Sequence, residues 1–291
     1  MKIAFVGDIH GRVFHMLAVV ANWQRVYDCK LDMIVQVGDF GAYPDPDEAM
    51  LGSRFVREDR TELDFGKYVR ADGPLAEAID AIKVQFQTPI RFIRGNHEDF
   101  RWLASQGDPA EEETSIDPFR LVRHIRDGAI KQIGGVKIAY LGGIETAGQE
   151  PKSIDDQAYN RILSCTPGEI DILVTHDAPY GIGTDFHGRT QGSRRISELI
   201  DRVRPKFLFA GHYHQRIGPL SFGPTVFFGL NILIPPRNDS RRTDPTEKAQ
   251  PGSLAILDTG SMTAGFVTDE RVLDVGRDFD FIKYAANRRF G

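Results

Sequence analysis

Side chains that could bind metal ions occur in five short stretches of this chain, and each stretch follows an apolar run. The stretches are Gly7-Asp8-Ile9-His10-Gly11, Gly38-Asp39, Arg94-Gly95-Asn96-His97-Glu98, Thr175-His176-Asp177 and Gly211-His212-Tyr213-His214. Residues two apart in an extended segment project to the same side, so Asp8 and His10 can reach a common point, as can His212 and His214. The stretches predict a site built from carboxylate, amide and imidazole groups.

The number of candidate metal ligands exceeds what a single ion uses. The candidates are Asp8, His10, Asp39, Asn96, His176, His212 and His214. Nitrogen and oxygen donors without a thiolate suit a pair of divalent ions such as manganese, iron or zinc, bridged by a carboxylate, and we prefer manganese. Such ions lower the pKa of bound water from about 15.7 to about 7 and clamp the oxygens of an in-line displacement at phosphorus.

The apolar runs before these stretches predict buried β-strands at residues 3–6, 31–37, 90–93, 170–174 and 207–210. Amphipathic patterns predict helices at residues 13–26, 75–86, 154–163 and 191–203. Residues 129–133 and 136–141 flank Gly134-Gly135, which predicts a hairpin with a primed turn. Active sites of open α/β sheets lie at strand ends, so we expect the five stretches to meet there.

Two polar segments interrupt this pattern. Residues 41–73 predict an insertion over the strand ends that helps to select the substrate, and residues 235–251 predict a mobile loop. We expect one domain over residues 1–291, with no element assigned to residues 269–291.

Composition excludes several classes of protein. The 291 residues are 41% hydrophobic and 26% charged, as in ordinary globular proteins. The net charge of −5 disfavours general attraction to nucleic acid, but two divalent ions would make the site itself attractive to phosphate. Two distant cysteines favour a reducing compartment, and the N-terminal apolar run is too short for a signal peptide or membrane span. We therefore expect a cytoplasmic protein with no membrane partner.

The five blocks, GDIHG, GD, GNHE, THD and GHYH, follow the order found in calcineurin-like metallophosphoesterases, and the chain resembles that family over residues 7–214. The resemblance implies an α/β fold of four layers, in which two mixed sheets pack face to face between helices. This α/β/β/α sandwich agrees with the helices and sheet segments predicted above.

The resemblance also implies roles for the site residues. Asp8, His10, Asp39 and His214 would hold the first ion; Asp39, Asn96, His176 and His212 would hold the second, with Asp39 as the bridge. A hydroxide between the ions would attack phosphorus. His97 would be catalytic, either protonating the leaving oxygen or stabilising the charge that develops on phosphorus.

Departures from the family pattern favour one branch. Protein serine/threonine phosphatases continue the second block as GDxxDRG, whereas Ala42 stands here in place of that carboxylate. The blocks look more like the branch that includes lariat-debranching nucleases, although those commonly carry cysteine where His10 stands. We therefore prefer a phosphodiesterase acting on a nucleotide or RNA. The alternative is a phosphomonoesterase for protein or small molecules; a scaffold without chemistry is disfavoured because all eight positions are retained.

Other polar residues have competing interpretations. Arg12 could touch phosphate or be a solvated arginine at a helix start, and His187 could overhang the site or belong to an ordinary loop. Glu98 and Asp177 are expected to support the ligands, while His15 and His124 are expected at the surface or in packing. Two arginine clusters could hold a polyanion, but a solvated face is preferred for both: Arg189, Arg194 and Arg195, and Arg237, Arg241 and Arg242.

Overall fold

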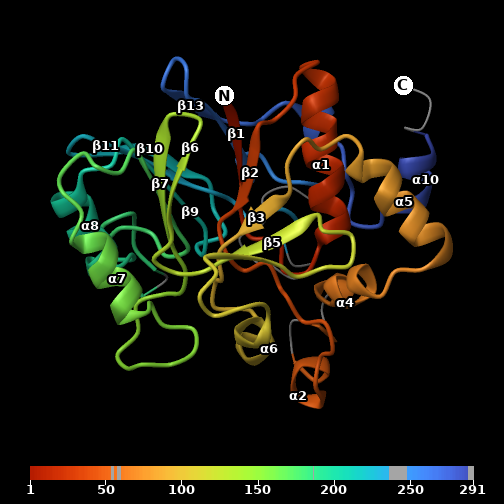
Figure 1. The fold of residues 1–291 in the computed structure, drawn as a ribbon, viewed down its shortest axis with the longest axis horizontal. Coiled ribbons are helices and arrows are strands. Elements are labelled where there is room, and N and C mark those ends of the chain that lie inside the picture. Colours follow the sequence, from red (N-terminus) through yellow and green to blue (C-terminus); the bar gives the residue numbers. More distant parts are fainter. Residues whose placement is uncertain (54–55, 58–59, 186, 236–247, 288–291) are drawn as a thin grey trace.

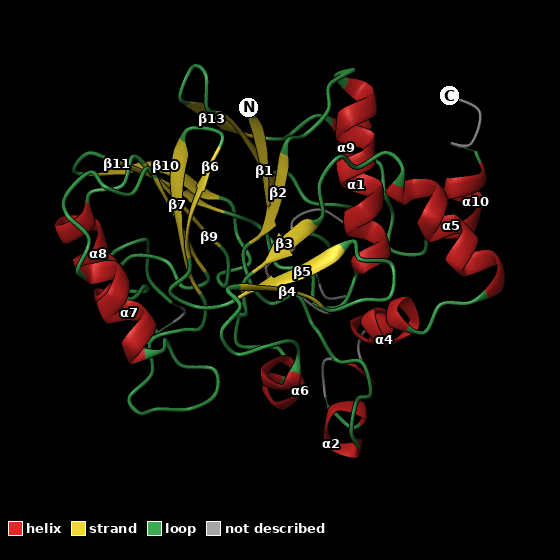
Figure 2. Cartoon of the chain, in the orientation of Figure 1, coloured by secondary structure: helices red, strands yellow, loops and turns green. Residues whose placement is uncertain are grey.

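The computed structural model describes residues 1–291 except 54–55, 58–59, 186, 236–247 and 288–291. Two mixed β-sheets pack face to face, and helices cover their outer faces (Figures 1 and 2). The first sheet has the order β13 (Thr263–Phe266), β12 (Leu254–Asp258), β1 (Lys2–Val6), β2 (Met33–Gln36), β3 (Ile90–Phe92), β5 (Val122–Ile125) and β4 (Glu113–Ser115). The second has the order β10 (Ile217–Phe222), β11 (Thr225–Gly229), β9 (Phe207–Ala210), β8 (Ile172–Thr175), β7 (Val136–Leu141) and β6 (Ile130–Ile133).

Helices form the two outer layers, which confirms the predicted four-layer α/β/β/α sandwich. The first sheet packs against α1 (Val13–Val26), α4 (Asp64–Val69), α5 (Gly73–Lys83), α9 (Glu270–Leu273) and α10 (Phe281–Ala286). The second packs against α7 (Asp156–Leu163) and α8 (Arg194–Val203). Short helices α2 (Glu48–Leu51) and α6 (Phe100–Ser105) lie near the bottom of Figure 1. No helix among the described residues is long and apolar enough to cross a membrane.

Successive side chains of β1 point to opposite faces of the first sheet, so this strand packs against both the outer helices and the second sheet. Ala4 and Val6 face the helices of the first outer layer, while Ile3 and Phe5 face the second sheet. Side chains of a strand point alternately to opposite faces, so an uninterrupted apolar run can bury both sides. Phe5 stacks on Phe209 of β9 with ring centroids 3.7 Å apart, joining the centres of the two sheets.

The parallel strands place their carboxyl ends together. In the first sheet, β1, β2, β3 and β5 run parallel, and in the second β7, β8, β9 and β11 do so. The loops after β1, β2, β3, β8 and β9 are those that carry the candidate ligands.

Most predicted elements are present with shifted ends. The hairpin β6–β7 is confirmed, and φ is positive at both turn residues, 55° at Gly134 and 86° at Gly135, as a primed turn requires. The helix expected from residue 191 begins at Arg194 because the Ser193 side chain accepts a hydrogen bond from the Ile196 N–H.

Other segments hold more structure than their sequences indicated. The insertion at residues 41–73 contains α2, a 3₁₀ helix η1 (Arg60–Leu63) and α4, which buries Phe65 and Tyr68 in the core around α1. Strands β4, β5 and β10 and helices α9 and α10 were not predicted. Of the loop expected at residues 235–251, residues 236–247 lie outside the described part of the chain.

Both histidines expected at the surface or in packing are packing residues. The Nε2 atom of His15 lies 2.8 Å from the Arg277 carbonyl oxygen, and the ring of His124 lies 5.1 Å from that of Phe92. Burial lowers the pKa of each to about 4. Both side chains are therefore neutral in the folded protein near pH 7.

His124 should make the fold sensitive to acid. Its folded pKa of about 4 lies below the ordinary 6.5, so its contribution to stability is complete above pH 6.5 and is lost as pH falls toward 4. The shift corresponds to roughly 3 kcal/mol. Urea unfolding at pH 7 and pH 4.5 should show a smaller loss of unfolding free energy in His124→Gln than in wild type. Equal losses in the two proteins would contradict this assignment.

Candidate metal centre

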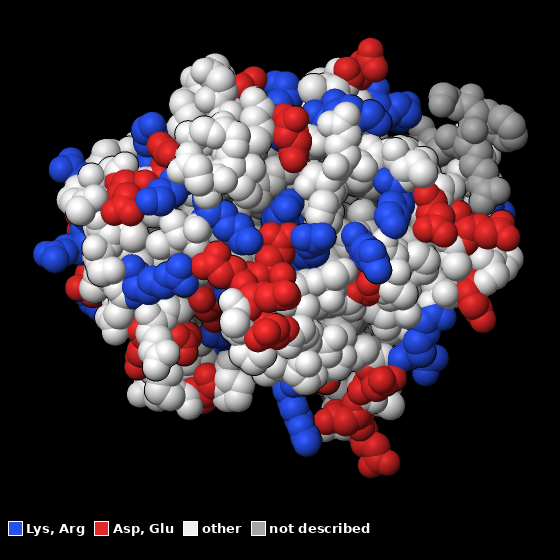
Figure 3. All heavy atoms as spheres, in the orientation of Figure 1, with Lys and Arg blue, Asp and Glu red and all other residues white. Residues whose placement is uncertain are grey.

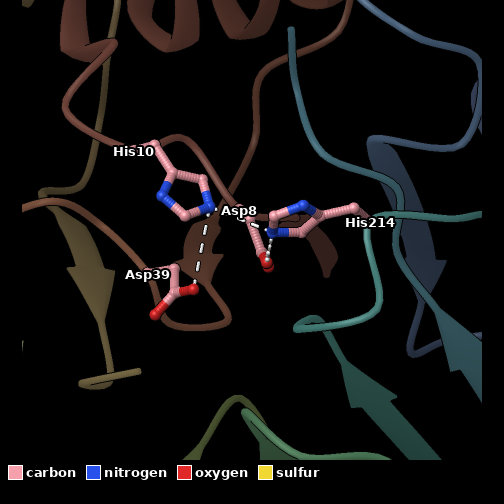
Figure 4. Close-up of side chains that lie close together, drawn as sticks. All are labelled: Asp8, His10, Asp39 and His214. Carbon is pink, nitrogen blue, oxygen red and sulfur yellow. Dashed lines mark hydrogen bonds and ion pairs between the residues drawn. The ribbon is translucent and has the colours of Figure 1, made fainter. Parts of the chain in front are cut away.

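The first group of candidate ligands combines the ends of β1, β2 and β9. The Nε2 atoms of His10 and His214 lie 3.0 Å apart, and His214 Nε2 lies 3.0 Å from Asp8 Oδ2. His10 Nε2 also lies 3.7 Å from Asp39 Oδ2. Figure 4 shows these four side chains directed toward a common point. One ligand atom from each lies within 4.8 Å of the others, which is compact enough for one cation.

A second group shares Asp39 with the first. His176 Nε2 lies 3.3 Å from Asp39 Oδ1 and 3.0 Å from the amide oxygen of Asn96. The ring of His212 is 5.2 Å from that of His176, and ligand atoms of Asp39, His176 and His212 also lie within 4.8 Å of one another. The structure thus brings all seven predicted ligands together, with Asp39 between the two groups.

The backbone is shaped for this convergence. Four of the candidate ligands have positive φ angles that side-chain-bearing residues seldom adopt: His10 at 44°, Asp39 at 53°, His212 at 71° and His214 at 51°. Such strained conformations cluster at functional sites. Gly95 and Gly211 allow close approach, because a Cβ atom would lie 2.1 Å from Asp39 Oδ1 at Gly95 and 2.0 Å from Asp8 Oδ1 at Gly211.

Supporting hydrogen bonds orient the ligands. His176 Nδ1 lies 3.0 Å from the Val37 carbonyl oxygen, so Nε2 is the ring nitrogen that faces the site. Asp39 Oδ1 accepts hydrogen bonds from the Asn96 and His97 N–H groups at 2.7 and 2.8 Å. Glu98 accepts from the Phe40 and Ala42 N–H groups, both at 2.8 Å. Glu98 therefore ties the second and third ligand loops together.

One buried carboxylate oxygen in the centre is left without a hydrogen bond by the described residues. Asp39 is 1% exposed, and its Oδ2 accepts no hydrogen bond from the described residues. Burial raises the pKa of Asp39, but His176, His10 and His97 outweigh burial and hold the pKa well below its usual range. An ionised carboxylate oxygen that accepts no hydrogen bond from the described residues and lies beside imidazole nitrogens fits a divalent cation.

The histidines respond to the same charges. Burial lowers the pKa of His10 well below its ordinary value, and the neighbouring His214 and His97 lower it further, against the Asp39 carboxylate. Burial also lowers the pKa of His176, but Asp39 more than compensates and raises it to about 10. Cation binding at His176 must therefore displace a proton.

Comparison with known proteins identifies the family. Residues 1–216 match the family model described as calcineurin-like phosphoesterase. The chain belongs to the calcineurin-like phosphoesterase family. It is accordingly a hydrolase of phosphoric esters in a metal-dependent family, with metal candidates in the two groups described above.

Two relatives place this calcineurin-like phosphoesterase near the branch that its motifs indicated. It is 24% identical to the lariat debranching enzyme of Arabidopsis thaliana over 332 aligned residues, covering 100% of this chain and 71% of the relative. It is 23% identical to the lariat debranching enzyme of Drosophila pseudoobscura pseudoobscura over 254 residues, covering 76% of this chain. The chain spans less than half of that second relative, 44% of its length.

A solved crystal structure has the same fold despite low sequence identity. It aligns with 91% of this chain and 98% of its own, at a TM-score of 0.52 and 10% identity. This likeness supports the sandwich of two sheets in the calcineurin-like phosphoesterase.

Three other residues considered from the sequence, His97, Asp177 and His187, lie in different surroundings. The His97 ring is half-buried, with its centroid 5.1 Å from that of His10. Asp177 accepts hydrogen bonds from the Glu145 N–H and the Tyr213 hydroxyl, as expected of a supporting residue. His187 is exposed on its loop.

Both interpretations of Arg12 are wrong. Its side chain is completely buried and forms an ion pair with Glu62. Nothing in the sequence around Glu62 predicted that its side chain would be buried beside Arg12. Of the arginines considered for polyanion binding, Arg189 pairs with Asp185, Arg195 pairs with Asp156, and Arg194 packs over the Tyr180 ring. The second arginine cluster, Arg237, Arg241 and Arg242, lies outside the described residues.

The close approach at Gly95 can be tested with a single methyl group. Gly95→Ala should displace Asp39 and weaken metal binding by about 10- to 100-fold, measured by calorimetric titration with Mn²⁺. Gly265→Ala is the matched control, since a Cβ atom there meets nothing within 4 Å. Binding by Gly95→Ala that equals the control would show that Asp39 does not need this approach.

Proposed function

We propose that this chain is a dinuclear phosphodiesterase that cleaves a nucleotide or nucleic acid such as RNA. The observation that carries the proposal is Asp39, which belongs to both ligand groups and has a buried oxygen that accepts no hydrogen bond within the described part of the chain. A carboxylate shared in this way suits a bridge between two ions. The relatives that are lariat debranching enzymes support the phosphodiester class.

In this proposal, each of the two ligand groups binds one ion. Asp8, His10, Asp39 and His214 would hold the first ion, and Asp39, Asn96, His176 and His212 the second. When bound, the ions supply water ionised near neutral pH and positive charge for the phosphoryl oxygens. Donors that are all nitrogen or oxygen suit manganese, iron or zinc, and of these we prefer manganese.

We propose that His97 acts on the substrate. Its N–H donates to Asp39 Oδ1, which fixes the backbone, and its ring borders the first ligand group near His10. A histidine at this edge can donate a proton to the departing alcohol oxygen or stabilise charge on phosphorus. We assign His97 as the catalytic residue.

The substrate is expected to be recognised at the site rather than by a broad basic surface. Lys and Arg side chains are interspersed with Asp and Glu over the face in Figure 3, and the whole chain carries a net charge of −5. Local positive charge from the ions would then provide the main attraction for phosphate. Cys29 and Cys165 are free thiols, which suits the cytoplasm that we propose as the location.

Paired model substrates test the reaction class. Metal-free protein should be supplied separately with Mn²⁺, Fe²⁺ and Zn²⁺ and assayed with bis-p-nitrophenyl phosphate and p-nitrophenyl phosphate. We expect higher kcat/KM for the diester, loss of turnover with a chelator, and recovery when metal is restored. A strong preference for the monoester would instead support the phosphomonoesterase alternative.

Replacement of His97 distinguishes its two possible roles. His97→Ala should lower kcat by about 10²–10⁴-fold while metal binding is retained. If His97 protonates the leaving oxygen, the loss should be larger for a nucleoside alcohol than for p-nitrophenol, which departs readily without a proton. An equal decrease in kcat with both substrates would indicate that His97 stabilises charge on phosphorus. An unchanged kcat with both substrates would show that His97 takes no part in the reaction.

A further inference from the structure

Glu62 reaches the candidate metal centre from the insertion that follows Asp39. It lies in η1, far from the five motif stretches in sequence, yet its side chain is only 7% exposed. Its main chain packs against the first motif loop, because a Cβ atom on Gly11 would lie 2.3 Å from the Glu62 carbonyl oxygen. The insertion is therefore in direct contact with the loop that carries Asp8 and His10.

The Glu62 carboxylate faces the nitrogen of His10 that points away from the ligands. Glu62 Oε2 lies 3.7 Å from His10 Nδ1, while His10 Nε2 faces His214 and Asp39. Histidines that bind metals usually donate their other N–H to a carboxylate or carbonyl group, which fixes the ring and its tautomer. His176 makes this hydrogen bond to the Val37 carbonyl oxygen at 3.0 Å, whereas Glu62 lies at ion-pair distance from His10 Nδ1.

Arg12 compensates the buried charge of Glu62. Glu62 Oε1 lies 3.5 Å from Arg12 Nη1, and Arg12 also donates from Nη1 to the Ile9 carbonyl oxygen at 3.4 Å. An isolated buried carboxylate is costly, and an adjacent guanidinium offsets part of that cost. Burial still outweighs Arg12 and raises the pKa of Glu62 to about 7. The row His10, Glu62 and Arg12 thus links a candidate ligand to a fixed positive charge behind it.

We infer that Glu62 is a positioning residue that holds the His10 ring with Nε2 toward the first metal position. Through Glu62, the insertion at residues 41–73 contributes to occupancy of the metal centre as well as covering the strand ends. This inference rests on the proposed function, because it takes His10 as a ligand of the first ion. Its effect should appear in metal affinity at one position and leave the other unchanged.

Calorimetric titration of metal-free protein with Mn²⁺ tests this role. Wild type should bind two ions, and Glu62→Gln should bind one of them about 10- to 100-fold more weakly while the other affinity is retained. Asp117→Asn is the control: Asp117 is also a buried carboxylate, but it accepts hydrogen bonds from the Tyr68 hydroxyl and the Val122 N–H. This control should lower thermal stability without changing either metal affinity.

The outcomes separate the inference from the proposed function. If wild type does not bind two ions, the dinuclear proposal fails. If wild type binds two ions and Glu62→Gln binds both equally well, Glu62 only supports the insertion and the inference is wrong.

If Glu62→Gln does not fold, the positioning role of Glu62 can still be tested on the wild-type protein. In Zn²⁺-loaded protein, imidazole NMR should show a His10 Nδ1 proton protected from exchange with water. Rapid exchange of that proton would overturn the positioning role.

Discussion

The candidate centre depends on a single buried carboxylate, that of Asp39, which belongs to both groups of candidate ligands. Asp39 Oδ1 is held by two backbone N–H groups, while His10 and His176 approach the carboxylate from either group. Removing an ionised carboxylate from water is unfavourable by several kcal/mol unless hydrogen bonds and opposite charges replace the lost hydration. The surrounding loops supply those partners, which explains why so much unusual backbone geometry gathers around this residue.

Packing between the sheets sets the geometry of the ligands. Asp8, Asp39 and Asn96 follow strands of the first sheet, whereas His176, His212 and His214 follow strands of the second. The distance between the two sets is therefore a distance between sheets. Phe5 and Phe209 stack in the core beneath, on the strands that lead to Asp8 and His212. Dense cores resist small displacements, so the ligand spacing is set well away from the ligands themselves.

The features that repeat at each strand end could be predicted from the local sequence. A short apolar run followed by glycine and a polar ligand was enough to predict the strands and the residues that meet, and family resemblance added their division into two groups. Strands β4 and β10, at the edges of the two sheets, were missed because their partner strands, rather than their own sequence patterns, determine them. Arg12 was misplaced for a related reason: nothing in its neighbourhood indicated that Glu62, fifty residues later, would be buried beside it.

The first sheet and its helical layer bring together segments near the two ends of the described chain. Strand β12 pairs with β1, and the Tyr284 hydroxyl of α10 donates to the Ala18 carbonyl oxygen of α1 at 3.0 Å. Strand β1 and helix α1 flank the loop that carries Asp8 and His10. During synthesis, this loop therefore acquires its final supports only after residues 254–258 and 284 have left the ribosome. The metal centre is therefore completed late in synthesis, because these supports follow every candidate ligand in the chain.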